Sequence, residues 1–472
     1  MLKEALFGSN YDFTEGDLNR AIVILAIPMI LEMVMESLFG VVDVFFVSRL
    51  GPDAVATVGL TESLLTLVFG VAIGLSMATT AFVARRIGEK DPAGAAESSV
   101  QAILLGLLLS AVVGAVGILK APALLHLMGS SAAVEANAHY TQVMLGGSAV
   151  IFLLFLINAI FRGAGDASLA MRALWIANGI NLVLDPCLIN GWGPFPRLGV
   201  LGAAVATTTG RGIGVLFQLW ALNSGANRIV IHRAQMRLNV PVMWHLLRVS
   251  ITGIVQFLLA TASWVALIRI VSSFGSSVVA GYTIAVRLLV FAILPSWGLS
   301  NAAATLVGQN LGAKKPERAE KSVYRTGFYN MGYMGLVSIA FVFFPGILVA
   351  VFTHDPAVSG PAISCLSIFG LAFVSYAWGM VLMQAFNGAG DTMTPTLINL
   401  LAFWACQIPI AYWLAIHLGW GPRGAFTAVP IADLDERSLD TYTIETISCE
   451  NGLCHSRRSV NRWFLPPARS RS

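Results

Sequence analysis

The sequence predicts an all-α integral membrane protein made of two six-helix lobes from a parallel internal repeat, with the twelfth helix truncated. Hydrophobic residues make up 56% of the 472-residue chain, and its apolar runs repeatedly exceed the roughly 20 residues that cross about 30 Å of hydrocarbon. Unpaired backbone groups are not tolerated in lipid, and these runs lack the alternation of barrel strands, so the spans are expected to be helices.

Eleven spans follow from the hydropathy pattern, and a twelfth begins near Gly424. We expect them at 21–47, 54–81, 97–119, 139–161, 168–190, 199–222, 243–272, 278–306, 323–352, 363–386 and 395–418. The first apolar run is too long for the core of a signal peptide, so we expect it to remain as the first span.

The basic residues predict the orientation of the spans, because they concentrate in the loops after even-numbered spans. They are Arg85, Arg86, Lys90, Arg162, Arg172, Arg228, Arg233, Arg237, Arg248, Lys314, Lys315, Arg318, Lys321 and Arg325. The positive-inside rule then predicts a multi-pass protein of the cell (inner) membrane whose amino terminus is cytoplasmic. The net charge of +4 is explained by this topology and does not indicate nucleic-acid binding.

An internal duplication organises the chain. The motif FRGAGD at 161–166 returns as FNGAGD at 386–391, and GWG occurs at 191–193 and at 419–421. Each unit should hold six spans, so both halves have the same orientation and are related by an axis along the membrane normal. The expected divisions are a cytoplasmic arm at 1–20, an amino-terminal lobe at 21–225, a cytoplasmic linker at 226–242, a carboxy-terminal lobe at 243–432 and a polar tail at 433–472.

The composition changes abruptly at Asp433, where the repeat requires the twelfth helix to continue. Hydrocarbon would not accept the sequence DLDERSLDTYTIETISCENGL that follows. It has the character of an out-of-frame reading or another disruption of a normal twelfth span. The alternative is a genuine, divergent cytoplasmic tail.

Two acids inside apolar stretches mark a candidate site, namely Asp43 in FGVVDVFF and Asp185 in INLVLDPC. Burying an ionised carboxylate costs several kcal/mol, so such residues usually face a bundle interior and handle ions or protons. Helical spacing places Glu32, Glu36 and Asp43 on one face, and it places Asn181 one turn from Asp185. The alternative is a pair of structural acids satisfied by polar neighbours.

Several ordered segments resemble the multidrug and toxic compound extrusion (MATE) family across about residues 15–432. They are IPMILEMVMESLFGVVDVFFVSRLGPDAVATVGL, GAGDASLAMRALWIANGINLVLDPCLINGWGPFPRLGVLGAAVAT, SSVVAGYTIAVRL and TLVGQNLGA. The resemblance implies two six-helix lobes and the export of organic, often cationic compounds, driven by inward flow of protons or sodium ions.

The resemblance also implies a cation site in the amino-terminal lobe, formed by Asp43, Asn181, Asp185 and Thr207. Two carboxylates in a weakly hydrated lobe cannot both ionise cheaply, which favours a shared proton. The same oxygens could coordinate a small hard cation if both acids were ionised. We favour protons and leave sodium open.

Further candidates surround this site. Glu32, Glu36 and Glu62 are possible secondary acids, and Pro28 removes a backbone hydrogen bond and permits a hinge in the first span. When the two repeats are aligned, Trp404 takes the position of Asn181. Tryptophan cannot bind a cation as asparagine can, so this alignment argues against a sodium site in the second lobe. Aromatic residues could line a substrate cleft or anchor the protein at the membrane interface, and the candidates are Trp175, Trp264, Trp297, Tyr376 and Trp378.

The sequence thus favours a secondary antiporter that works by alternating access and requires no cofactor. Its expected partners are small organic substrates, protons or sodium ions and membrane lipid, and we expect a monomer. A lipid-linked sugar flippase is the runner-up if the cleft is strongly basic, and a nonfunctional truncated transporter is a third reading. A membrane-embedded enzyme would need an acid cluster such as DDxxD, which the sequence lacks.

Overall fold

The structure is a computed structural model that describes residues 1–9, 11–224, 228–231 and 235–433. Within these ranges the regular structure is helical and contains no strand. Eleven of the described helices are long and apolar enough to cross a membrane. The predicted all-α membrane fold is therefore confirmed.

The amino-terminal lobe starts at α2, whose first turn is capped by the Asp17 carboxylate through the amides of Asn19 and Arg20. The fourth expected span is divided into α6 and α7, which meet at Gly147. The helices are α1 (Leu2–Phe7), α2 (Leu18–Ser48), α3 (Pro52–Gly88), α4 (Pro92–Leu127), α5 (Ala132–Glu135), α6 (Ala138–Gly146), α7 (Ser148–Ala164), α8 (Ala167–Asn190) and α9 (Val200–Asn223).

The carboxy-terminal lobe contains α10 (Val240–Ser272), α11 (Ser276–Gly312), α12 (Pro316–Phe343), α13 (Pro345–Ala350), α14 (Pro356–Ala389), α15 (Met393–Asn399) and α16 (Ile408–Tyr412). The helix is π-helical before and after α16, at Leu400–Gln407 and Trp413–His417. The ninth span was expected to end at residue 352, and this boundary was wrong, because α12 ends at Phe343. Pro345 has no N–H to continue α12, so the chain starts a separate short helix there.

The start of the twelfth helix is present, because residues 422–433 are helical. Phe426 in this segment is fully buried, and its ring stacks on Tyr282 of α11 at 5.9 Å between ring centroids. The expected disruption beyond Asp433 lies outside the described residues.

The repeated FRGAGD and FNGAGD motifs form equivalent turns between helices. Gly165 ends α7 and Gly390 ends α14, with φ angles of 88° and 87° that strongly favour glycine. In the second copy, the Asp391 carboxylate accepts hydrogen bonds from the amides of Met393 and Thr394 at the start of α15. In both copies the motif therefore ends one helix at a glycine, and in the second copy its aspartate also caps the next helix.

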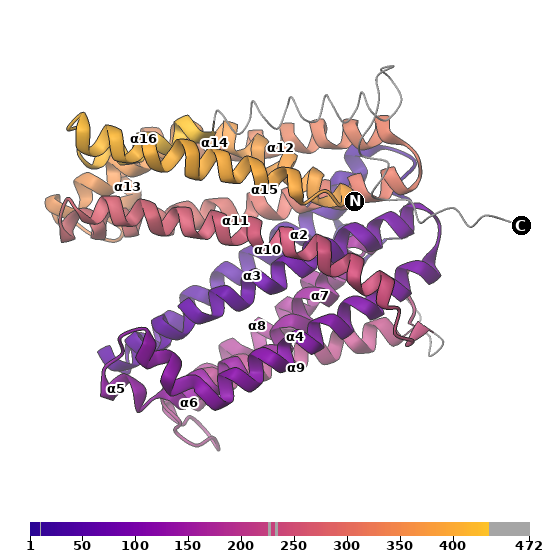
Figure 1. Cartoon of the computed structure of the whole chain (residues 1–472), viewed down its shortest axis with the longest axis horizontal. Helices are drawn as coiled ribbons and strands as arrows, with labels where there is room; N and C mark the ends of the chain where they lie inside the picture. The colour runs from indigo at the N-terminus through magenta and orange to yellow at the C-terminus, as the bar shows by residue number, and fades with distance from the viewer. Residues whose placement is uncertain (10, 225–227, 232–234, 434–472) are drawn as a thin grey trace, which may run out of the picture.

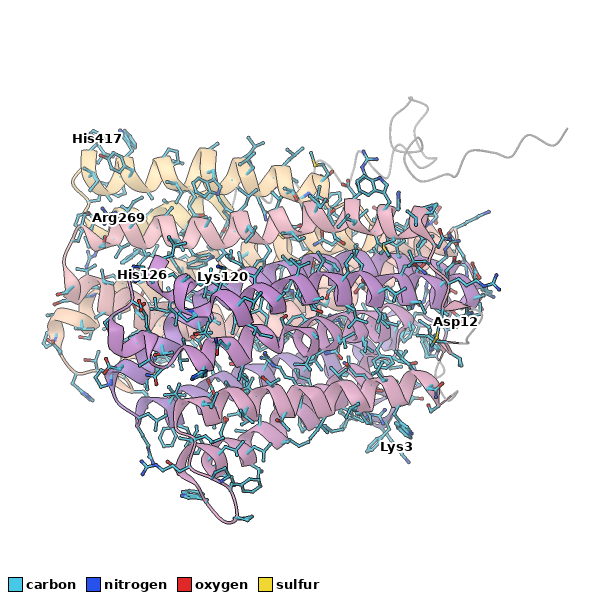
Figure 2. The ribbon with its side chains drawn as sticks, turned by 60° about the horizontal axis from the view of Figure 1, so that its bottom comes forward. Lys3, Asp12, Lys120, His126, Arg269 and His417 are labelled. Atoms are coloured by element: carbon cyan, nitrogen blue, oxygen red, sulfur yellow. The ribbon has the colours of Figure 1, made fainter. Side chains whose placement is uncertain are left out.

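The two lobes approach each other at one end and diverge at the other (Figure 1). They pack through α2 against α11 and through α3 against α10 and α11. We call the end where α3 and α11 finish the narrow end, and the end carrying α5 and α6 the wide end. Figure 2 shows Asp12 and Lys3 toward the narrow end, with Lys120, His126, Arg269 and His417 toward the other.

Glycine permits the close crossing of α3 and α11 at the narrow end. A Cβ on Gly88 would collide with the backbone carbonyl of Gln309, and one on Gly312 would collide with the carbonyl of Arg85. The Gln309 amide also donates across the interface to the Gly163 carbonyl at 2.8 Å. Backbone packing and hydrogen bonds thus hold the lobes together at this end.

Candidate functional site

A buried polar cluster joins α8 to α9 inside the amino-terminal lobe. The Asn181 amide nitrogen donates to the Asp185 carboxylate at 3.2 Å and to the Thr207 hydroxyl at 3.1 Å. Asp185 has 0% of its surface exposed. Asn181 and Asp185 share a face because they are four residues apart on α8. The structure therefore brings together three of the four residues of the expected cation site.

Asp43 of α2, the fourth residue, is also buried and lies close enough to Asp185 for the two carboxylates to interact electrostatically. Among the described residues, no hydrogen-bond donor reaches Asp43 Oδ1, Asp185 Oδ2 or Asn181 Oδ1. Buried acceptors without partners are rare and costly. This group of oxygens has the chemistry to accept a proton or a small hard cation.

Sequence reasoning missed Arg211, which lies one turn after Thr207 on α9 and is 6% exposed. Its Nη2 atom lies 3.7 Å from Glu36 Oε1, and its guanidinium carbon lies 5.5 Å from the Phe39 ring centroid and 5.6 Å from that of Phe69. Arg211 also interacts electrostatically with Asp43. The four-residue spacing from Thr207 was the signal that could have revealed it.

The possible secondary acids have separate environments. Glu32 is 2% exposed and accepts hydrogen bonds from Arg162 Nη1 at 2.8 Å and from the Asn158 amide at 3.0 Å. Glu36 accepts from the Asn178 amide at 3.2 Å. Glu62 of α3 is exposed and interacts electrostatically with Asp43. Glu32 and Glu36 thus each lie beside an arginine.

A cavity of about 210 Å³ lies between the lobes and reaches these pairs. On the amino-terminal side, its charged lining residues are Glu32, Glu36, Arg162 and Arg211. On the carboxy-terminal side, it is lined by the amides Asn301, Gln384 and Asn387 together with Trp297. One wall therefore carries acid–arginine pairs and the other carries neutral amides.

Of the five aromatic candidates for a substrate cleft, Trp297 lines this cavity. Trp264 packs in the second lobe against Phe369, and Tyr376 is partly buried in the same core. Trp378 is 7% exposed and contacts Tyr324 and Phe328. The rings of these three residues therefore pack in the apolar interior of the second lobe.

Trp175 and Trp404 form matching contacts in the two lobes. The Trp175 indole donates to the Leu31 carbonyl of α2 at 3.2 Å, and the Trp404 indole donates to the Leu259 carbonyl of α10 at 3.3 Å. Trp404 is thus the structural counterpart of Trp175, and its alignment with Asn181 was wrong. It lies in the π-helical segment, where wider turns accommodate additional residues and shift the register.

Pro28 lies inside α2, as expected of the candidate hinge. Immediately after it, the backbone of Met29 meets Gly298 of α11, where a Cβ would lie 2.6 Å from the Met29 carbonyl oxygen. The candidate hinge is therefore next to a direct contact between the two lobes.

Two bundles of membrane helices around a shared cavity, with charged and polar groups buried beside it, define a multi-pass membrane transporter. A protein-family model described as MatE matches residues 28–187 and 253–413, once in each lobe. The chain belongs to the MATE family of multidrug and toxic compound transporters.

Curated relatives agree with this assignment. The chain is 26% identical over 430 residues to a probable multidrug resistance protein NorM of Thermotoga maritima, covering 89% of this chain and 91% of that protein. It is 27% identical over 429 residues to an FAD transporter of Shewanella oneidensis, covering 88% and 92% of the two chains.

Solved structures match the fold over most of its length. A crystal structure of MATE in complex with MaL6 has a TM-score of 0.88 and 26% identity, covering 93% of this chain and 98% of that one. An outward-facing multidrug resistance MATE family transporter of the MOP superfamily has a TM-score of 0.87, 26% identity and the same coverage.

Proposed function

We propose that this protein is a secondary active antiporter, which exports organic, cationic or amphipathic compounds in exchange for protons or sodium ions by alternating access. The observation that carries the proposal is the buried cluster of Asp43, Asn181, Asp185 and Thr207, in which some acceptor oxygens have no donor within the part of the chain that the structure describes. Protonation or cation binding there would neutralise a buried charge and so change the relative stability of two conformations.

Protons remain our first choice for the coupling ion. Two carboxylates that repel each other in a buried site readily share one proton. A sodium ion would need both acids ionised, with Asn181 and Thr207 as further oxygen ligands. Arg211 already brings a positive charge to this region, which disfavours a second fixed cation.

For orientation, we propose that the narrow end is cytoplasmic. The helix ends there carry Arg85, Arg86, Lys90, Lys314 and Arg318, as the positive-inside rule requires. The lobes would then diverge toward the outside, as in the outward-facing relative. We retain lobe boundaries at 21–225 and 243–432 around a linker at 226–242, and we place the protein in the inner membrane as a monomer.

For conformational change, we propose that Pro28 is the hinge. The proline has no N–H to pair with the preceding turn of α2, so bending there breaks fewer hydrogen bonds than elsewhere. Because α2 also carries Glu32, Glu36 and Asp43, a bend would move all three acids together.

The flippase alternative depended on a strongly basic cleft. Arg162 lies 2.8 Å from Glu32 and Arg211 lies 3.7 Å from Glu36. The two positive charges are therefore locally balanced by two negative ones, which does not favour a polyanionic lipid-linked substrate. The names of the relatives, which include multidrug resistance proteins and an FAD transporter, likewise support a small organic substrate.

Efflux from vesicles under an imposed proton or sodium gradient tests the proposal. We expect the purified protein in proteoliposomes to drive efflux of an organic dye with one of these gradients. Asp43→Asn and Asp185→Asn should both reduce gradient-driven efflux to background, because the amides remove the exchangeable negative charges. Asp53→Asn, at the exposed start of α3, is the matched control and should transport at the wild-type rate.

The outcomes separate two parts of the proposal. Full activity in both buried-site variants would show that the cation-site assignment is wrong. Efflux by the wild type that is unaffected by either gradient would show that antiport itself is wrong.

A further inference from the structure

The segment before α2 crosses the narrow end between the lobes. We call residues 11–17 the N-terminal strap. Its fold is fixed internally, because the Tyr11 hydroxyl donates to the Asp17 carbonyl at 2.8 Å and the Asp12 carboxylate accepts from the Thr14 amide at 2.9 Å. Gly16 has a φ of 70° and lies against the Tyr11 hydroxyl. The strap is thus an ordered loop joined directly to α2.

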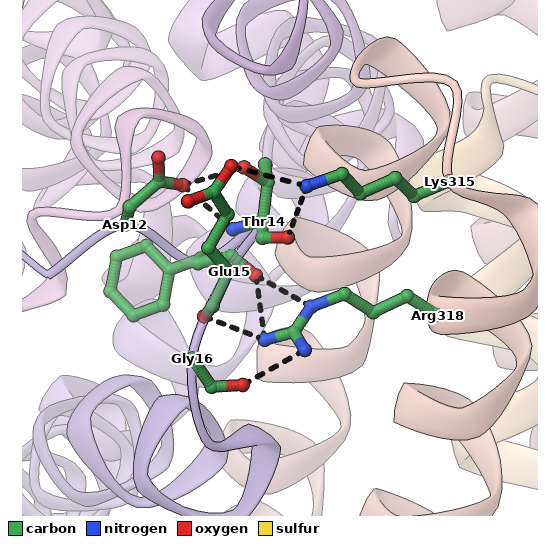
Figure 3. Close-up of polar contacts among 7 residues, drawn as sticks. Asp12, Thr14, Glu15, Gly16, Lys315 and Arg318 are labelled. Atoms are coloured by element: carbon green, nitrogen blue, oxygen red, sulfur yellow. Dashed lines mark hydrogen bonds and ion pairs between the residues drawn. The ribbon is translucent and has the colours of Figure 1, made fainter.

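Basic side chains of the carboxy-terminal lobe hold the main chain of the strap (Figure 3). Arg318 of α12 donates to the carbonyls of Glu15 at 2.8 Å and Gly16 at 3.0 Å. Lys315, just before α12, donates to the Thr14 carbonyl at 3.0 Å. The acceptors are backbone oxygens, so these contacts depend on the conformation of the strap more than on its side chains.

On the other side, Arg228 connects the strap to the amino-terminal lobe. It donates to the Tyr11 carbonyl at 2.6 Å and to the Ala164 carbonyl at the end of α7 at 3.4 Å. Its guanidinium carbon also lies 5.0 Å from the ring centroid of Phe13. Separate arginines therefore connect one short loop to both lobes.

Phe13 adds an apolar contact between the lobes. Its side chain has 0% exposure and belongs to a cluster with Leu25 of α2, Ala167 of α8 and Leu306 of α11. A buried phenylalanine contributes several kcal/mol to the contacts around it. The ring thus lies between helices of both lobes at the end where they are closest.

We propose that the N-terminal strap is a lock that holds the narrow end closed. Because the strap continues into the capped first turn of α2, it moves with the amino-terminal lobe. Any separation of the lobes at this end must break its hydrogen bonds to Arg318 and Lys315 and withdraw Phe13 from the residues of α11. The strap therefore stabilises the conformation that is closed here.

Spin-label distances across the narrow end test the lock without requiring transport. One label is attached at Ala93→Cys on α4 and the other at Glu317→Cys on α12, with the native cysteines replaced by alanine. Both positions are exposed. In lipid nanodiscs, Arg318→Gln should raise the ratio of long to short distances by about tenfold or more, because hydrogen bonds to a charged donor are lost.

Two more variants and a control make the test specific. Arg228→Gln loosens the strap against the end of α7, and Phe13→Ala removes its apolar contact with α11. Each variant should therefore increase the long-distance population. Lys321→Gln removes the same charge from α12 without removing a contact to the strap, and it should match the wild type. Unchanged distances in properly folded Arg318→Gln protein would overturn the proposal, as would equal widening in Lys321→Gln.

Discussion

At the scale of single residues, the amino-terminal lobe buries charge mainly by pairing. Glu32 receives hydrogen bonds from Arg162 and Asn158, and the side-chain amide oxygen of Asn158 in turn accepts from the Gln218 amide at 2.7 Å. Glu32, Asp43 and Asp185 each keep one carboxylate oxygen without a donor among the described residues, but of these three acids it is Glu32 that forms an ion pair within this part of the chain, with Arg162 at 2.8 Å. This contrast supports our proposal that Asp43 and Asp185, and not the paired Glu32, exchange ions.

The Glu32–Arg162 pair predicts a large effect on stability. Arg162→Gln should destabilise the protein by about 3–5 kcal/mol, because it leaves a buried carboxylate without its counter-charge. The measurement is the apparent free energy of unfolding in detergent micelles. Glu32 is the side chain that makes this change costly, since it is 2% exposed.

The matched control for this prediction is the double variant Glu32→Gln/Arg162→Gln. It should recover most of the lost stability, because two neutral amides replace the unpaired charge. A double variant as unstable as Arg162→Gln alone would contradict a role for charge pairing.

Asp12 in the strap predicts a pH dependence. Burial raises its pKa, but hydrogen bonds from Thr14 and the positive charges of Lys90 and Arg228 hold the pKa below the ordinary value of 3.8. A carboxyl group whose pKa is lowered by folding contributes stability above its unfolded pKa and loses it as the pH falls through the folded value.

We therefore expect Asp12→Asn to lower the melting temperature at neutral pH, and we expect the difference from wild type to shrink below about pH 4. Thermal unfolding of both proteins from pH 3 to pH 8 checks this expectation. A difference that stays constant down to pH 3 would contradict it. Thr14→Val, which removes one donor to Asp12, should reproduce part of the effect.

At the scale of helices, small residues and special turns decide how the elements meet. Gly165 and Gly390 end equivalent helices in left-handed conformations. Gly88 and Gly312 instead permit the backbones of α3 and α11 to touch. Trp175 and Trp404 make the same indole-to-carbonyl contact in each lobe. The duplication therefore preserved contacts between helices even where the polar residues of the proposed cation site were not repeated.

Because α3 and α11 cross closely, replacing two different glycines of α3 by alanine should have different effects on stability. Gly88→Ala should destabilise the protein by about 1–3 kcal/mol, because the new methyl group meets the Gln309 backbone. Gly59→Ala has open space around it, so it should be neutral or slightly stabilising through helix propensity. The two variants are compared by their melting temperatures in the same detergent. Equal losses in both variants would refute close packing as the cause.

At the scale of the whole molecule, the cavity lies between two lobes that approach each other at one end and diverge at the other. Helices of both lobes line it, with acid–arginine pairs on one wall and amides on the other. Motion of one lobe against the other would therefore change the surroundings of a bound substrate from both sides. The strap and the glycine crossing oppose that motion at the narrow end.

The size of the cavity predicts a steric block. Leu294 lines this cavity of about 210 Å³, and Leu294→Trp replaces its side chain with a larger aromatic ring. The variant should reduce dye efflux at least about tenfold, with little effect on folding. Leu336→Trp on α12 is the control, because Leu336 is 70% exposed on the outer surface. Efflux rates and monodispersity are measured for both variants. Wild-type efflux by Leu294→Trp would place the substrate route elsewhere.

Hydropathy and repetition in the sequence determined the helical membrane class, the eleven spans and the duplicated lobes, and the resemblance of several ordered segments indicated the family. These properties are local or periodic, so they can be read along the chain. Spacing also identified Asn181 and Asp185 as neighbours, since one helical turn separates them.

Only the tertiary structure decided which distant side chains meet. It brought Arg211 to Glu36, packed Trp378 in the core of the second lobe and placed Phe13 between the lobes. Such contacts depend on how helices far apart in the chain rotate and pack, and apolar helices admit many such arrangements with similar hydropathy. The packing of the whole molecule selects one of them.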